Sequence, residues 1–171
     1  MKKIVVFGKP GSGKSTLSKS LASATKIKWH ALDSIEFKKN GDRVDRVAYD
    51  EEHENILSSD SWIIDGLGTI ESFNKRLDAA DTLIYIELPY IISYWMVTKR
   101  LLKGVLVKPE GWPDGSSILK GTLEGYKVLK LCPKFWNNNF MEKLEQISTN
   151  KSLYVIRSVS ELNSFVDKNV K

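Results

Sequence analysis

The stretch GKPGSGKST, residues 8–16, separates two segments that both look ordered. The preceding KKIVVF (2–7) is apolar and β-branched, as expected for a buried strand, and the following LSKSLASAT (17–25) is typical of a helix. Three glycines and one proline in the first six residues of the stretch would ordinarily indicate a pliable surface turn. Their position between a buried strand and a helix requires a further explanation.

Residues 8–15 fit the pattern G-x-x-x-x-G-K-[ST], which describes a phosphate-binding loop. Gly8, Gly11 and Gly13 permit unusual backbone angles, so that consecutive N–H groups can turn toward phosphate oxygens. The helix that follows presents unpaired N–H groups and the positive end of its dipole to the same anion. A strand before the pattern and a helix after it are the context that the pattern requires. The sequence therefore predicts phosphate binding at this loop.

The last residues of the loop supply a charge and a metal ligand. Lys14 adds a positive charge that can reach the β and γ phosphates of a nucleotide, and Ser15 offers its hydroxyl to Mg²⁺. The pattern assigns no role to the spacer positions Lys9 and Pro10. The loop is suited to a nucleotide that binds together with a divalent cation.

Apolar runs alternate with helix-like segments along the whole chain. Strands that are apolar on both faces and alternate with helices indicate a parallel sheet covered on each side. The sequence thus predicts an α/β fold, a doubly wound five-stranded parallel sheet with helices on both faces, as one domain over residues 1–171. The expected strands are 4–8, 27–33, 61–66, 81–88 and 152–157, and the expected helices are 14–25, 46–59, 69–80, 90–104, 117–131, 137–149 and 159–169.

Two aspartates follow strands of the predicted sheet, whose ligand crevice lies at the carboxyl ends of the strands. Asp65 ends the third strand and is followed by Gly66, so its carboxylate can hold the water shell of Mg²⁺ opposite Ser15. Asp33 ends the second strand and can bind an acceptor hydroxyl, accept its proton, or help hold the metal. Aspartate is also suited to capping a helix or turn, which is the alternative at both positions.

Composition narrows the class of protein. The chain has 171 residues, 42% of them hydrophobic and 27% charged, as in a globular domain. Its longest apolar stretch, near residues 90–97, is far shorter than a membrane span, and the N-terminus does not resemble a signal peptide. A single cysteine, Cys132, excludes an internal disulfide and a cysteine cluster for zinc. We therefore expect a cytoplasmic protein without membrane contact; the composition predicts no oligomeric state.

Basic residues concentrate in one segment. Residues 98–134 contain eight basic and three acidic residues, an excess equal to the net charge of +5 of the whole chain. Within this segment, residues 104–117 are rich in glycine and proline, which predicts a loop that can act as a mobile cover. Such a segment favours a polyanionic partner, either nucleotide phosphates or a nucleic acid. A solvated lysine-rich face is the alternative.

Four stretches in order resemble the adenylate-kinase-like P-loop kinases and are most similar to bacterial proteins known as DNA topology modulation proteins. The resemblance is close over residues 1–104 and loose beyond them. The stretches are GKPGSGKST (8–16), HALDSIEF (30–37), SWIIDG (61–66) and KRLDAADTLIYIEL (75–88).

The resemblance implies a nucleotide-kinase-like fold that binds Mg-ATP at residues 8–16. It implies a basic lid over about residues 99–134 that closes on the phosphates, and an acceptor-binding segment over residues 34–60. Asp65 matches the family's metal-associated aspartate, and Ser15 joins it on the metal. The residues expected to act in catalysis are Lys14, Asp33 and Arg100, and those expected to bind ATP are Gly8, Gly11, Ser12, Gly13, Lys14, Ser15 and Thr16.

The chain also departs from adenylate kinases. Leu67-Gly68-Thr69 stand where those enzymes have an aromatic residue, proline and arginine for the acceptor nucleotide, and Arg100 is the only arginine in a lysine-rich lid. Three further arginines are candidate acceptor contacts but are predicted to be ordinary surface residues. They are Arg43, Arg46 and Arg76.

The leading hypothesis is a phosphotransferase, a small-molecule kinase that uses Mg-ATP on a nucleoside, nucleotide or other hydroxyl compound. The alternative is a nucleic-acid-associated P-loop ATPase, favoured by the pI of 9.2 and by tryptophans that can stack on bases, Trp112 and Trp136. A regulatory GTPase is disfavoured because NKRLD (74–78) has one residue too many for the guanine-reading motif. The sequence does not name the acceptor.

Overall fold

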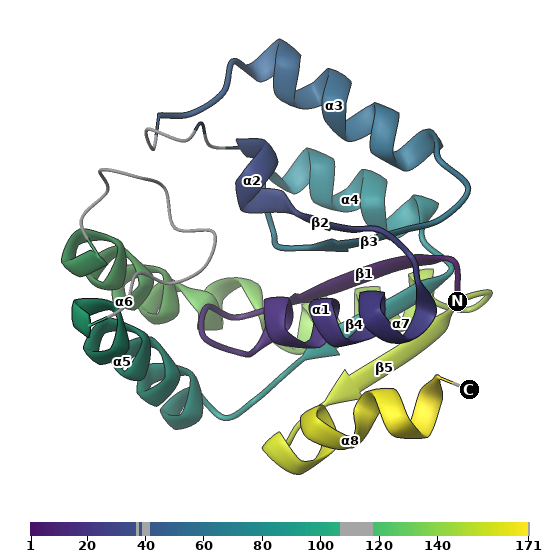
Figure 1. Cartoon of the computed structure of the whole chain (residues 1–171). Helices are drawn as coiled ribbons and strands as arrows, with labels where there is room; N and C mark the ends of the chain where they lie inside the picture. Colours follow the sequence, from purple (N-terminus) through teal and green to yellow (C-terminus); the bar gives the residue numbers. More distant parts are fainter. Residues whose placement is uncertain (37, 39–41, 107–117, 171) are drawn as a thin grey trace.

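The computed structural model describes residues 1–36, 38, 42–106 and 118–170, and only the backbone at 100, 103–106 and 118–121 (Figure 1). Five strands form one sheet with the order β2-β3-β1-β4-β5, and every neighbouring pair is parallel. The strands are β1 (Lys3–Gly8), β2 (Trp29–Ala31), β3 (Trp62–Asp65), β4 (Thr82–Ile86) and β5 (Ser152–Ile156). The helices are α1 (Lys14–Thr25), α2 (Leu32–Glu36), α3 (Arg46–Ser58), α4 (Ile70–Ala79), α5 (Tyr90–Leu106), α6 (Ile118–Phe135), α7 (Asn138–Ile147) and α8 (Val159–Asn169).

Side chains of the central strands alternate between two apolar layers, one on each face of the sheet. In β1, Val5 and Phe7 join the layer under α3, α4 and α7, whereas Ile4 and Val6 join the layer under α1 and α8. All four side chains are fully buried. The predicted doubly wound α/β fold with helices on both faces is confirmed.

An aromatic cluster fills the layer beneath α4 and α7. The Phe7 ring stacks on Tyr85 with centroids 5.4 Å apart and meets the Phe73 ring edge-on with centroids 5.3 Å apart. Trp136 stacks on Tyr85 at 5.3 Å, and Phe140 meets Trp136 edge-on at 4.8 Å. The cluster ties the strands β1 and β4 to the end of α6 and the start of α7.

Helices α5 and α6 pack side by side and project from one end of the sheet (Figure 1). Tyr94 stacks on Tyr126 with centroids 5.8 Å apart, and the hydroxyls of Thr98 and Tyr126 are hydrogen-bonded at 2.5 Å. Among the described residues, no helix is long and apolar enough to cross a membrane.

Most of the predicted elements have ends shifted by one or two residues, and two differences have a clear structural cause. The second strand is only Trp29–Ala31, because Leu32 turns into the short helix α2 and packs in the core rather than continuing the sheet. Helix α6 runs past Pro133 to Phe135, instead of ending near residue 131. A proline so close to a helix end removes only one donor, and the packing of Phe135 against the core compensates.

Replacement of Phe73 by alanine tests the aromatic cluster. The side chain is 1% exposed and contacts the rings of Phe7, Trp136 and Phe140. We expect Phe73→Ala to lower the free energy of unfolding by about 3–5 kcal/mol, as measured by urea denaturation. Ile91→Ala is the control, because Ile91 is 78% exposed and its loss should cost less than about 0.5 kcal/mol. Equal losses in the two variants would contradict the assigned core.

Candidate phosphate and acceptor site

The loop between β1 and α1 has the backbone that a phosphate cradle needs. Gly8, Gly11 and Gly13 have φ values of 145°, 70° and 87°. A Cβ atom on Gly8 would collide with the backbone carbonyl oxygen of Ile86 on the neighbouring strand. Gly8 is thus required both by its dihedral angle and by the close approach of the loop to β4.

The N-terminus of α1 carries no side-chain cap. Its N-cap is Gly13, whereas the N-caps of α3, α4, α7 and α8 all accept a hydrogen bond from their own helix. Helix α1 therefore begins without the side-chain acceptor that those four helices have. The Ser12 hydroxyl in the same loop is fully buried and has no hydrogen-bond partner. An anion with several acceptor oxygens would satisfy both features.

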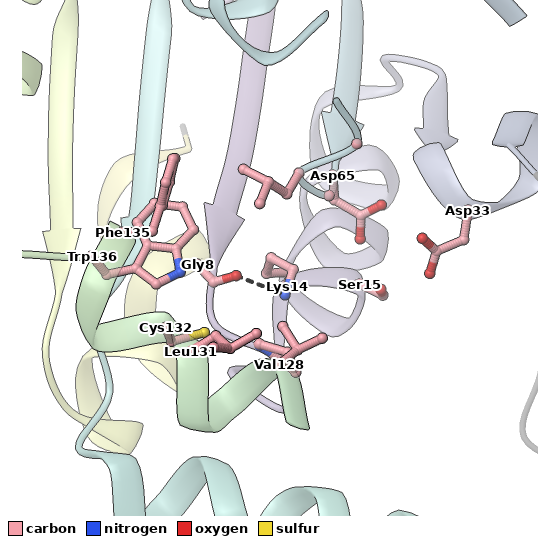
Figure 2. A pocket seen from close by; sticks show the side chains of 14 residues that line it. Gly8, Lys14, Ser15, Asp33, Asp65, Val128, Leu131, Cys132, Phe135 and Trp136 are labelled. Atoms are coloured by element: carbon pink, nitrogen blue, oxygen red, sulfur yellow. Dashed lines mark hydrogen bonds between the residues drawn. The ribbon is translucent and has the colours of Figure 1, made fainter. Parts of the chain in front are cut away.

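Lys14 bends over the loop that precedes it. Its ammonium donates to the carbonyl oxygen of Gly8 at 3.1 Å (Figure 2) and to that of Lys9 at 2.9 Å. Lys9, to which the sequence assigned no role, is 3% exposed and lies 4.2 Å from the centroid of the Tyr90 ring. Burial lowers the pKa of Lys9. Lys9 joins the loop to the start of α5.

Asp65 ends β3, as predicted, and is 4% exposed. Burial raises the pKa of its carboxyl group, and the Ser15 hydroxyl and the Lys14 ammonium oppose part of that rise. The Trp29 indole also lowers the pKa of Asp65. Trp29 Nε1 and Asp65 Oδ2 are nevertheless each buried without a partner at normal hydrogen-bond length. An unsatisfied carboxylate oxygen next to a serine hydroxyl fits a Mg²⁺ ion or its water shell.

The sequence predicted that Asp33 ends the second strand, but the residue lies in the first turn of α2. The backbone turns one residue earlier, where Leu32 enters the core, so the Asp33 side chain is left exposed. It nevertheless lines the same pocket as Lys14, Ser15 and Asp65, and Figure 2 shows its carboxylate on the side of the pocket away from Phe135 and Trp136. The structure thus brings the two predicted aspartates to one site.

This pocket has a volume of about 420 Å³, within the range of about 300–1,000 Å³ common for ligand sites. One side is the phosphate-binding loop and the two aspartates. The other side is the C-terminal half of α6 together with the residue that follows it. Up to residue 134 this segment was predicted only to be part of a basic lid. The wall on that side consists of Val128, Leu131, Cys132, Phe135 and Trp136.

Arg76 is fully buried, so its prediction as a surface residue is wrong. Its guanidinium donates to the carbonyl oxygens of Leu67 at 2.5 Å and of Gly66 at 3.4 Å, in the loop that follows Asp65. The sequence signal was its place on the apolar side of α4, where Phe73 and Leu77 are also buried. Arg76 holds the loop on which one side of the pocket depends.

Arg43 and Arg46, in contrast, are exposed as predicted. Arg46 pairs with Asp50 at 2.7 Å and with Glu71 at 3.1 Å, and Arg43 lies 3.6 Å from Glu36. Neither arginine lines the pocket. Both arginines form ordinary surface ion pairs, and such pairs contribute little to stability.

His53 completes the surroundings of Arg76. It is 1% exposed, stacks on Tyr49 at 5.9 Å, and its Nε2 lies 3.1 Å from a guanidinium nitrogen of Arg76. Since a guanidinium can only donate, Nε2 accepts and the imidazole is neutral. Burial lowers the pKa of His53 to about 4, and the charge of Arg76 acts in the same direction. The acidic stretch DEEHEN (50–55) predicts a solvated face for His53, and that prediction is wrong.

Part of the predicted lid lies outside the described residues. Arg100 belongs to α5, but its side chain is not described, and neither are residues 107–117, which include Trp112. Trp136, the other tryptophan predicted to be able to stack on bases, packs in the aromatic cluster.

No protein-family model and no curated protein matches this sequence. Among solved structures, a gluconokinase from Sinorhizobium meliloti 1021 is similar with a TM-score of 0.52 and 16% identity, over 99% of this chain and 89% of that one. A sugar kinase from Janibacter sp. HTCC2649 has a TM-score of 0.47 and 15% identity, over 98% and 91%. The first likeness shows that the chain shares its α/β fold with that gluconokinase. The resemblance to DNA topology modulation proteins stays a prediction.

The neutral His53 makes stability depend on pH. Its pKa is about 4 in the folded state against an ordinary value of 6.5, so the unfolded chain binds the proton more readily. The contribution of neutral His53 is fully present above pH 6.5 and is lost as the pH falls toward 4. We expect the free energy of unfolding to fall by about 2 kcal/mol from this residue between pH 7 and pH 5.

The measurement is urea denaturation of the wild type and of His53→Gln at both pH values. Glutamine can still accept from Arg76 but does not titrate. The variant should lose less stability than the wild type on acidification, by about that amount. An identical loss in the two proteins would contradict the assignment.

Proposed function

We propose that this protein is a kinase that transfers the terminal phosphoryl group of ATP, bound with Mg²⁺, to a hydroxyl group of a small molecule. The observation that carries the proposal is a single pocket that joins an uncapped phosphate-binding loop to two carboxylates, Asp65 and Asp33. The Asp65 carboxylate is buried beside Ser15, and the Asp33 carboxylate is exposed in the same pocket. This arrangement offers separate places for a phosphate, a metal and an acceptor. The likeness of the fold to a gluconokinase supports the reaction class.

The phosphate side of the site would be formed by Lys14 and by backbone N–H groups of the glycine-rich loop and of the start of α1. A bound nucleotide would supply the phosphoryl group, and a Mg²⁺ ion held beside it would supply positive charge for the phosphate oxygens. Lys14 would exchange its bonds to the Gly8 and Lys9 carbonyl oxygens for bonds to phosphate. Ser12 and Thr16 belong to the same cradle, and Arg100 would add charge from α5.

The metal side is formed by Ser15 and Asp65. Among the described residues, no cluster of three or more His, Cys, Asp or Glu side chains can hold a metal by itself. Mg²⁺ commonly binds through one or two protein ligands together with nucleotide phosphates and water. Ser15 and Asp65 are such a pair, and they would hold the ion only when the nucleotide is present.

Asp33 is the group on the acceptor side. Its exposed carboxylate would accept a hydrogen bond from the acceptor hydroxyl and take its proton as the phosphoryl group is transferred. Asp33 and Lys14 line the same pocket, so an acceptor bound between them would face the phosphate (Figure 2). Positioning and electrostatic stabilisation would account for most of the catalysis.

The test is a coupled assay of ADP release with Mg-ATP and a panel of nucleosides, nucleotides, sugars, sugar acids and small alcohols, with oligonucleotides included. Release that rises with one small hydroxyl compound, with the phosphorylated product identified by mass spectrometry, supports the proposal. Release that rises only with an oligonucleotide would replace it with a nucleic-acid-associated ATPase.

Lys14→Ala tests the phosphate side. Removal of the ammonium should reduce acceptor-stimulated ADP release at least about 100-fold, which corresponds to about 2.7 kcal/mol in the activation free energy. The matched control is Lys28→Ala, since Lys28 is exposed and lies away from the pocket. Circular dichroism should show both variants folded. A folded Lys14→Ala protein with normal activity would contradict the proposal.

Asp65→Asn tests the metal side through two opposite effects. Because burial raises the pKa of Asp65, the ionised carboxylate is disfavoured in the folded protein, and we expect the neutral variant to have an equal or higher melting temperature without ligand. We also expect its affinity for Mg-nucleotide to fall roughly 10- to 100-fold, as measured by calorimetry. A destabilised variant with unchanged nucleotide affinity would show that Asp65 serves only the fold.

A further inference from the structure

We propose that the acceptor is a neutral hydroxyl compound that carries a flat, apolar ring, as nucleosides do, rather than an anion such as a sugar acid or a nucleoside monophosphate. This inference rests on the proposed kinase function and adds the chemical class of the second substrate. Three features of the pocket carry it: an apolar wall, the rigidity of that wall, and the sign of the charges around it.

The apolar wall is the C-terminal half of α6, and Figure 2 shows it on the side of the pocket away from Asp33. Val128 and Leu131 are 47% and 57% exposed, so their apolar surface lacks a cover in the described structure. A ligand between this wall and Asp33 would remove that surface from water while its hydroxyl reaches the carboxylate. A polyhydroxylated chain would leave the same surface in contact with polar groups.

The wall is held by the core. Phe135 packs edge-on against Trp136 with centroids 4.6 Å apart, and Trp136 stacks on Tyr85 at 5.3 Å. Cys132, between the exposed residues and this pair, is 5% exposed. Because the aromatic side chains are fixed before a ligand binds, little conformational entropy is lost on binding, which favours a rigid, flat ligand.

The charges of the pocket oppose an anionic acceptor. Two carboxylates, Asp33 and Asp65, line it, and among the described lining residues Lys14 is the only cation. Lys14 lies over the glycine-rich loop and would serve the nucleotide. The described lysines of α6 (Lys127, Lys130 and Lys134) are exposed and do not line the pocket. A carboxylate or phosphate on the acceptor would therefore meet like charges, with no second cation beside it in the described part of the lining.

Calorimetry with matched pairs of ligands tests the class directly. The protein is saturated with Mg²⁺ and a non-hydrolysable ATP analogue and titrated with thymidine and thymidine monophosphate, adenosine and adenosine monophosphate, and gluconate. We expect at least one nucleoside to bind ten times or more tightly than its monophosphate, and gluconate not to bind measurably. Tighter binding of a monophosphate or of gluconate, or no binding of either nucleoside, would overturn the inference.

A charge introduced into the wall should reverse the preference. Leu131→Arg places a cation in the pocket, and we expect the affinity for the monophosphate relative to the nucleoside to rise at least tenfold. Leu123→Arg is the matched control, because Leu123 lies on the same helix, is 53% exposed and does not line the pocket. Melting temperatures establish that both variants fold. An equal preference in the two variants would contradict the assigned wall.

ADP release with the same ligands separates this inference from the proposed function. Preferential binding of a nucleoside without any ADP release would support the ligand class and overturn the kinase. Release driven by a monophosphate or by gluconate would support the kinase and overturn the ligand class.

Discussion

The close approach of Gly8 to the carbonyl of Ile86 is the constraint on which the site depends. It allows β1 to end against β4 and the chain to turn back over the sheet edge into α1. The Lys14 ammonium then lies over the loop carbonyls, and the N-terminus of α1 remains uncapped. A side chain at residue 8 would displace the loop, and the aspartates at the same sheet edge would lose the phosphate side of their pocket.

The loop that follows Asp65, which also lines the pocket, depends on buried polar groups. Arg76 lies in the interior without a carboxylate at salt-bridge distance among the described residues and donates to the Leu67 carbonyl and to neutral His53. Burial of a cation costs free energy unless its donors are satisfied, and here backbone carbonyl oxygens and the imidazole provide much of that compensation. Arg76 thus holds the loop after Asp65. Because its contact with His53 requires a neutral imidazole, the folded state loses stability in acid. Pocket geometry and fold stability are thus coupled through one arginine.

Much of the site could be predicted from local patterns. The loop 8–16 and Asp65 have roles that depend on a strand end and a helix start, and such boundaries leave clear signals in the sequence. Asp33 was placed on the wrong element, because the turn at Leu32 reflects packing in the core and not a local turn signal. Arg76 and His53 were assigned to the surface, since residue type alone favours exposure for charged and polar side chains.

By itself the sequence determined the parallel α/β fold, the glycine-rich loop between β1 and α1 and the carboxylate at the end of β3, because each of these follows from periodicity and short-range spacing. Only the tertiary structure decided what faces that loop. Leu131 and Trp136 lie more than a hundred residues from Lys14, and the pairing of α6 with the sheet edge arises from the packing of the aromatic cluster. No local pattern encodes a contact between such distant residues, so the apolar wall and the fixed position of Arg76 become visible only when the chain is folded.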